Sequence, residues 1–310
     1  MPYRDIVDAI GHTPLVELTR FPLKKGVRLF AKLEGNNPTG SVKDRIARYM
    51  LEEAEQQGKL APGGTILEAT SGNTGISLAF LARRKGYKLT VVLPENVSQE
   101  RIELLRLYGT EIIFSPADKG TNGAIAIAEE MARDPRYFMP YQFGNPANPR
   151  AHYETTAKEI LDELPQVDVF LAGLGAGGTL MGVGRRLKEH NPRARVIAVA
   201  PNPGDSIEGL RSLEEGFVPP ILDISLLDRR TIVDSRESIR ATRELTEREG
   251  IFAGISSGAV ISCALKVAQQ LEKGNIVALL ADGGWKYLST QLWTRPMEEI
   301  EPRVQTQPWW

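Results

Sequence analysis

Residues 65–94 read TILEATSGNTGISLAFLARRKGYKLTVVLP, and this stretch decides the architecture expected for the chain. Two short apolar runs, 65–70 and 88–94, flank a segment, 75–86, whose apolar residues recur at helical spacing. A strand, a helix and a second strand in this order are typical of a parallel β-α-β unit.

The same alternation continues along most of the chain. Further apolar runs stand at 111–116, 167–175, 194–201 and 275–282, and helical patterns stand at 98–109, 122–133, up to about residue 188, and at 256–274. The runs are rich in Val, Ile and Leu, as in parallel strands that helices cover on both faces. A Pro-, Gly- and Asn-rich stretch at 141–150 predicts a boundary. We therefore expect an α/β protein with two open, twisted, parallel-type sheets flanked by helices.

Composition excludes several classes of function. The 310 residues carry a net charge of -1, which argues against a nucleic-acid or membrane partner. Three scattered histidines and one cysteine predict neither a metal site nor a disulfide, and Cys263 lies on an apolar helical stripe typical of core. The N-terminus does not resemble a signal peptide, and no apolar run is long enough to span a membrane. We expect a cytoplasmic protein.

Lys43 stands in an unusual place. Residues 34–45 read EGNNPTGSVKDR, and the pattern predicts a helix over about 42–57 with Ser41 as N-cap and Asp44 completing a capping box. Lys43 then falls in the first helical turn, where the helix dipole disfavours an ammonium ion. Either this lysine bends into water, or it is kept neutral or bonded as an imine.

Two glycine-rich turns follow predicted strands and open predicted helices. Residues 70–75, TSGNTG, offer hydroxyl, amide and N–H groups to a carboxylate or phosphate, although such residues also make ordinary turns. Residues 173–179, GLGAGGT, match the dinucleotide fingerprint, but the acid required about twenty residues later is missing, which disfavours an NAD-linked dehydrogenase. What remains is a cradle for one phosphate. A cofactor with one phosphate and a lysine-reactive aldehyde satisfies all three features, and pyridoxal 5'-phosphate is such a molecule.

Seven stretches, in order, resemble the cysteine synthases, pyridoxal-phosphate enzymes of fold type II: GHTPLV, NPTGSVKDR, EATSGNTGISLA, YQFGNPANP, GLGAGGTLMG, GIFAGISSGAV and WKYLST. The resemblance covers nearly the whole chain. Within the family the chain is most similar to cysteine synthase B, and GLRSLEEGF and the terminal PWW resemble the actinobacterial type that uses O-phosphoserine.

The resemblance implies a role for each matching residue. Lys43 would form the Schiff base and act as general base, and Asn73 would bond the cofactor ring's 3'-oxygen. Gly175, Ala176, Gly177, Gly178 and Thr179 would hold the cofactor phosphate. Ser256, expected to cap its helix, is favoured over Asp282 as the partner of the ring nitrogen. The substrate carboxylate would be held by Thr70, Ser71, Thr74 and Gln142.

Arg211 is a candidate for the phosphate of O-phosphoserine, since a guanidinium binds phosphate oxygens bidentately. From local sequence alone it could equally be a surface arginine paired with Glu214 or Glu215. The tail 304–310, VQTQPWW, could dock on the protein surface or act as a flap over the active site.

The implied reaction is cysteine formation by β-replacement on an activated serine, O-phosphoserine preferred and O-acetylserine possible, through α-aminoacrylate. The sulfur donor would be sulfide, thiosulfate or the thiocarboxylate of a carrier protein. Rival reactions on the same scaffold are serine/threonine dehydration, threonine synthesis and cystathionine formation. The resemblance also implies a homodimer. Residues 1–40 with 148–310 would form the larger, phosphate-binding domain, and 41–147 a smaller mobile domain carrying Asn73.

Overall fold

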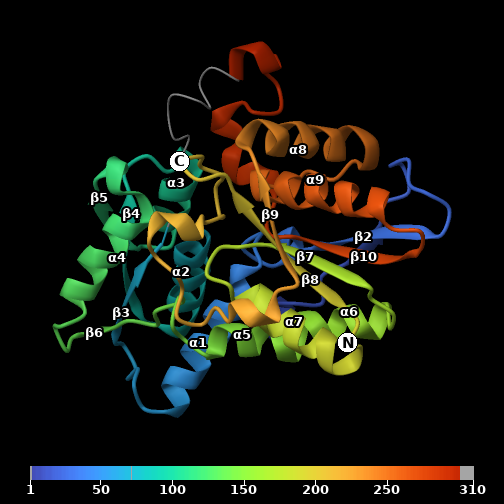
Figure 1. Ribbon diagram of the computed structural model, residues 1–310. Coiled ribbons are helices and arrows are strands. Elements are labelled where there is room, and N and C mark those ends of the chain that lie inside the picture. Colours follow the sequence, from blue (N-terminus) through green and yellow to red (C-terminus); the bar gives the residue numbers. More distant parts are fainter. Residues whose placement is uncertain (1, 71, 301–310) are drawn as a thin grey trace.

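The computed structural model describes residues 2–70 and 72–300, and its strands form two separate sheets (Figure 1). The larger sheet has the order β1-β2-β10-β7-β8-β9, and the smaller sheet the order β5-β4-β3-β6. Neighbouring strands run parallel, except that β1 is antiparallel to β2. The strands are β1 (Leu15–Glu17), β2 (Val27–Leu33), β3 (Thr65–Ala69), β4 (Lys88–Pro94), β5 (Glu111–Ser115), β6 (Tyr137–Phe138), β7 (Val169–Gly173), β8 (Arg195–Pro201), β9 (Arg229–Val233) and β10 (Gly274–Leu280).

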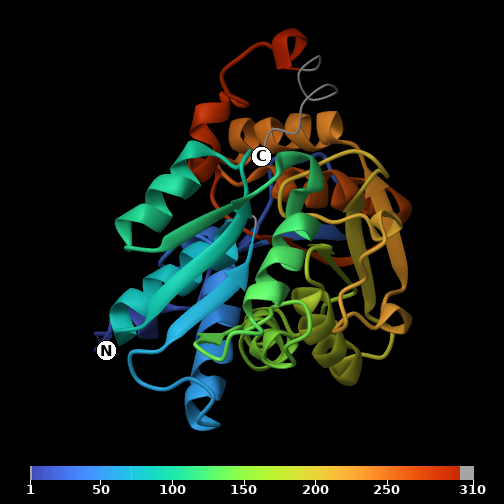
Figure 2. The same cartoon turned by 90° about the vertical axis from the view of Figure 1, so that its left-hand side faces the viewer.

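Helices cover both faces of each sheet. On the larger sheet, α8 and α9 lie on one face and α6 and α7 on the other (Figure 1). On the smaller sheet, α1, α2 and α3 pack on one face, and α4, which faces the viewer in Figure 2, packs on the other. The helices are α1 (Lys43–Gln56), α2 (Asn73–Lys85), α3 (Gln99–Leu107), α4 (Gly120–Met131), α5 (Ala147–Ala151), α6 (Ala157–Glu163), α7 (Gly178–His190), α8 (Ser235–Glu249) and α9 (Ile255–Gln270). The predicted α/β class with two parallel-type sheets is therefore confirmed.

The chain order explains why one site can draw on both sheets. The smaller sheet takes its strands from 65–138, and the larger sheet from 15–33 and 169–280. Helix α1 joins them and packs against α2 on one side and α5 on the other. The carboxyl ends of β3, β7 and β10 lead into the segments that begin at 70, 174 and 281, and ligands of open parallel sheets bind at such ends.

Several further predictions can be compared with this fold. Cys263 is fully buried in the core between α9 and the larger sheet, as predicted, and burial raises the pKa of its thiol to about 12. Ser71 and the tail 304–310 lie outside the described residues, so the flap stays a prediction. In the described part of the chain, no helix is long and apolar enough to cross a membrane.

Candidate active site

Lys43 is the first residue of α1, and the loop before it is firmly held. The helix has Val42, not Ser41, at its N-cap position, although the Ser41 hydroxyl accepts a hydrogen bond from the Lys43 N–H at 3.1 Å. The predicted capping box is wrong, because the Asp44 carboxylate accepts from the Thr39 N–H at 2.7 Å instead of turning back to Ser41. Asp44 thereby ties the start of α1 to the loop that precedes it.

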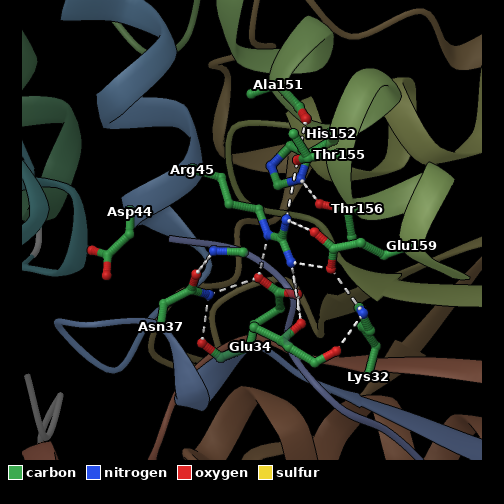
Figure 3. Close-up of polar contacts among 12 residues, drawn as sticks. Lys32, Glu34, Asn37, Asp44, Arg45, Ala151, His152, Thr155, Thr156 and Glu159 are labelled. Carbon is green, nitrogen blue, oxygen red and sulfur yellow. Dashed lines mark hydrogen bonds and ion pairs between the residues drawn. The ribbon is translucent and has the colours of Figure 1, made fainter. Parts of the chain in front are cut away.

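A buried ion network fixes the same helix end from the other side (Figure 3). The Arg45 guanidinium contacts Glu34 (Nε–Oε2 2.7 Å) and Glu159 (Nη1–Oε1 2.6 Å), and Lys32 Nζ lies 2.9 Å from Glu159 Oε2. The cations hold the pKa of Glu159 at about 2 and lower that of Glu34 against the opposing effect of burial. The network joins α1, α6 and the end of β2, so ion pairs hold the backbone next to Lys43 in place.

Burial lowers the pKa of Lys43, while the charges of Asp282 and Glu34 oppose that change. The side chain lines a pocket that encloses about 650 Å³ of empty space, part of it open to solvent. Lys43 therefore faces a cleft rather than bulk water, and its amine loses its proton more readily than an exposed lysine.

The same pocket brings together most of the predicted cofactor residues. Its lining includes Lys43, Asn73, the turn 175–179 and Ser256. Ser256 is buried in the first turn of α9, but it is not the helix cap, because Gly254 holds that position. Asp282 stands just behind the lining and accepts a hydrogen bond from Asn73 Nδ2 at 2.8 Å.

The turn 175–179 is shaped for a phosphate group. Within the described residues, the N–H groups of Gly175, Ala176 and Gly177 have no hydrogen-bond acceptor. Gly177 has φ +90°, and a Cβ at Gly178 would lie 1.8 Å from Asn148 Oδ1. Free N–H groups at the start of α7 form an anion site, and the missing side chains leave it open. The residues present therefore fit the phosphate of the predicted cofactor.

His152 supports this turn and was not singled out from the sequence. Its Nε2 lies 3.2 Å from Thr179 Oγ1, and its Nδ1 lies 3.0 Å from Thr156 Oγ1. Burial, aided by the charge of Arg45, lowers the pKa of His152 to about 3, so the imidazole is neutral. It orients the Thr179 hydroxyl without adding charge to the cradle.

Lys286 is a second buried lysine at the site, also missed in the sequence. Its Nζ donates to Asn73 Oδ1 at 2.7 Å, while Asp282 accepts from both Asn73 and the Tyr287 hydroxyl, the latter at 2.7 Å. Lys286 lies in the WKYLST stretch that resembles the family, but its contact with Asn73, more than 200 residues earlier in the chain, is visible only in the structure.

Three of the predicted substrate residues, Thr70, Thr74 and Gln142, make hydrogen bonds near the end of β3. Thr70 Oγ1 accepts from the Gly72 and Gly75 N–H groups at 3.0 and 3.3 Å, which shapes the loop. Thr74 Oγ1 donates to Gln142 Oε1 at 2.8 Å. A substrate carboxylate bound here would accept hydrogen bonds from these hydroxyl and N–H groups. That role of the loop stays a prediction.

Arg211 is buried and held from both sides. Its Nη1 donates to Asn122 Oδ1 at 2.7 Å, and its guanidinium lies over the rings of Phe143 and Phe217, at 5.3 and 4.7 Å from their centroids. Arg211 is buried, so the alternative of an exposed arginine is wrong, and Glu214 pairs with Arg230. The alternative pairing with Glu215 lies outside the described side chains. Arg211 is not itself among the described residues that line the pocket, but it follows Gly209 and Leu210, which are.

The described residues contain no group of three or more His, Cys, Asp or Glu side chains placed to hold a metal ion.

Comparison with known proteins agrees with this geometry. The family model for pyridoxal-phosphate dependent enzymes matches residues 6–282. A cysteine synthase of Staphylococcus aureus (strain Mu50 / ATCC 700699) is 43% identical over 303 residues, which is 94% of this chain and 98% of the relative. Among solved structures, an O-ureido-L-serine synthase is similar with a TM-score of 0.89 and 39% identity, covering 97% of this chain and 100% of the other. An O-acetylserine dependent cystathionine β-synthase from Helicobacter pylori has a TM-score of 0.87 and 38% identity, covering 93% and 98%.

The family match, over residues 6–282, spans both sheets and the pocket-lining residues from Val42 to Ala281. Together the comparisons confirm fold type II, the cofactor and the enzyme class predicted from the sequence. The chain therefore belongs to the pyridoxal-phosphate dependent enzyme family, as a β-replacement enzyme of the cysteine-synthase type.

Proposed function

We propose that this enzyme makes cysteine from O-phosphoserine in preference to O-acetylserine. The observation that carries the proposal is Arg211, a buried guanidinium next to the pocket-lining residues Gly209 and Leu210. A leaving phosphate dianion needs a positive partner, whereas an acetyl ester does not. The Helicobacter pylori relative is named as dependent on O-acetylserine, so the preference of this chain for O-phosphoserine needs a direct test.

In the proposed reaction, different residues around the pocket move the substrate proton and orient the substrate carboxylate. When bound, pyridoxal phosphate withdraws electrons from the substrate Cα, which lets the β-substituent leave. Lys43 binds the cofactor and then moves the proton at the substrate Cα, a task that suits an amine whose pKa is lowered. Thr70, Ser71, Thr74 and Gln142 orient the substrate carboxylate.

Around the cofactor, the turn 175–179 holds the phosphate and Asn73 contacts the ring's oxygen. We assign the ring nitrogen to Ser256, since Ser256 lines the pocket and Asp282 is not among its lining residues. Asp282 Oδ2 accepts from both Asn73 and Tyr287, while its Oδ1 has no hydrogen-bond partner within the described residues. A hydroxyl leaves that nitrogen neutral, which is sufficient for expelling a good leaving group.

Closure of residues 41–147 over the rest of the chain would exclude water from the reacting Cβ. We further propose that the enzyme works as a homodimer in the cytoplasm and takes sulfide or the thiocarboxylate of a carrier protein as sulfur donor. Sedimentation at working concentration tests the dimer, and parallel assays with the two donors decide between them.

The substrate preference is tested by measuring kcat/KM for O-phosphoserine and O-acetylserine in the wild type and in Arg211→Ala. A charge-assisted hydrogen bond to phosphate contributes roughly 1.5–3 kcal/mol, so the O-phosphoserine value should fall at least about tenfold while the O-acetylserine value changes little. The matched control is Arg230→Ala, which removes an arginine that pairs with Glu214 and is not among the described residues that line the pocket. Equal losses for both substrates would show that Arg211 supports the fold, and release of pyruvate despite added sulfide would favour a dehydratase.

A further inference from the structure

Lys286 connects three segments of the active site. It lies in the 3-10 turn Gly284–Thr290 and is fully buried. Its Nζ donates to Asn73 Oδ1 at 2.7 Å and to the Gly40 carbonyl oxygen at 3.4 Å, while its own carbonyl accepts from Ser98 Oγ at 2.8 Å. Nothing in the mechanism above uses this lysine.

The two partners of the Asn73 amide dictate its orientation. An ammonium group only donates hydrogen bonds, and a carboxylate only accepts them. Oδ1 must therefore face Lys286, and Nδ2 must face Asp282, at 2.7 and 2.8 Å. The opposite orientation would place a carbonyl oxygen against a carboxylate and an NH₂ group against an ammonium group. Lys286 and Asp282 together exclude this opposite orientation, so a variant without Lys286 loses one of the two groups that do so.

Lys286 stays protonated near neutral pH in spite of its burial. Burial lowers its pKa to about 8, the charges of Asp282 and Asp44 oppose this, and Arg101 and Lys43 add to it. The Trp285 ring, whose centroid lies 5.3 Å from Nζ, offers a further favourable contact to the charge.

We propose that Lys286 is a positioning residue that holds the Asn73 amide with Oδ1 toward the lysine, so that one N–H of Nδ2 meets Asp282 and the second can be offered to the cofactor ring. The proposal rests on the cofactor contact assigned to Asn73 under the proposed function. Asn73 must offer an N–H group to the ring's oxygen, and it can do so only while its Oδ1 is held elsewhere. Lys286 is the donor that holds it.

A double-mutant cycle tests this proposal on the cofactor-loaded enzyme. Lys286→Met has a similar length but no donor and no charge. We expect Lys286→Met to lower kcat at least about tenfold, the loss of one charge-assisted hydrogen bond. In an Asn73→Ala background the same change should cost less than about twofold, because the two residues act as one unit. The visible absorbance of the bound cofactor should shift in Lys286→Met in the same direction as in Asn73→Ala.

The control is Lys266→Met, the same change at an exposed lysine paired with Glu237. Thermal melting of each variant reports whether it folds. Equal loss of kcat in both backgrounds, or an unaltered cofactor spectrum in Lys286→Met, would overturn the proposal and leave Lys286 as a structural lysine. A wild-type protein that binds no pyridoxal phosphate would overturn the proposed function as well, so the two failures are distinct.

Discussion

Replacing Glu68 with glutamine should make the stability of this enzyme less dependent on pH. Glu68 lies in β3, two residues before Thr70, and its side chain is fully buried. Neither carboxyl oxygen makes a hydrogen bond of normal geometry within the described residues. Burial raises the pKa of Glu68 to about 8, and the backbone N–H groups of Gln142, Tyr141 and Ala69 only partly oppose that rise. The carboxyl group is therefore neutral in the folded enzyme at neutral pH.

The sign of the effect follows from proton binding. In the unfolded chain a glutamate has its ordinary pKa of 4.5, whereas burial raises the pKa of Glu68 in the folded enzyme to about 8. Between these values the folded state binds more protons, so the free energy of unfolding falls as pH rises and the stabilisation is lost by about pH 8. From pH 5.5 to 8, at about 1.36 kcal/mol per pH unit, the loss is roughly 3 kcal/mol.

Urea unfolding of the wild type and Glu68→Gln at pH 5.5 and 8 measures this loss. Other groups titrate in both proteins, so the informative quantity is the change in their difference, expected to move by roughly 3 kcal/mol in favour of Glu68→Gln at the higher pH. Glu95→Gln, at an exposed position after β4, serves as the control. The same pH dependence in the wild type and Glu68→Gln would refute the neutral carboxyl group.

Three further outcomes are expected. Lys43→Ala should abolish turnover, measured as cysteine formed, while phosphate-dependent binding of the cofactor at the turn 175–179 persists; appreciable turnover would mean another base. Gly178→Ala should weaken cofactor binding at least about tenfold in an absorbance titration, because its Cβ would fall 1.8 Å from Asn148 Oδ1 and displace the cradle, and unchanged affinity would count against the assigned cradle. Arg45→Met leaves two buried carboxylates without their guanidinium and should lower the free energy of unfolding by about 3–5 kcal/mol; a loss below about 1 kcal/mol would show that the network contributes little.

The alternation of strands and helices was predictable because both faces of each central strand are buried, which leaves continuous apolar runs. Strands that lack this property were missed. β2 carries Arg28 and Lys32, and the charge of the buried Lys32 is paired with Glu159 and Glu163, far along the chain. β9 begins with Arg229 and Arg230 and lies at the sheet edge, where polar side chains reach water. Charge pairing across the fold is not visible in hydrophobic periodicity.

The site was predictable where chemistry depends on local backbone. The turn at 175–179 and the loop at 70–75 are each made of adjacent residues, so their composition was enough to predict an anion site at each. Glu68 carries no such local signal, and the motif around Lys286 does not show which residue the lysine contacts. Each is an ordinary charged residue in sequence and becomes informative only through complete burial and through partners that other elements supply.

The orientation of Asn73 depends on both sheets at once. Asn73 opens α2, which packs on the smaller sheet, whereas Asp282 and Lys286 follow β10 of the larger sheet. Its two hydrogen bonds therefore cross from one sheet's elements to the other's. Both bonds must survive the movement proposed for residues 41–147 if Lys286 and Asp282 are to keep the Asn73 amide in one orientation. The proposed closure therefore has to turn about a point near Asn73, so that the substrate is covered while the two bonds across the sheets are kept.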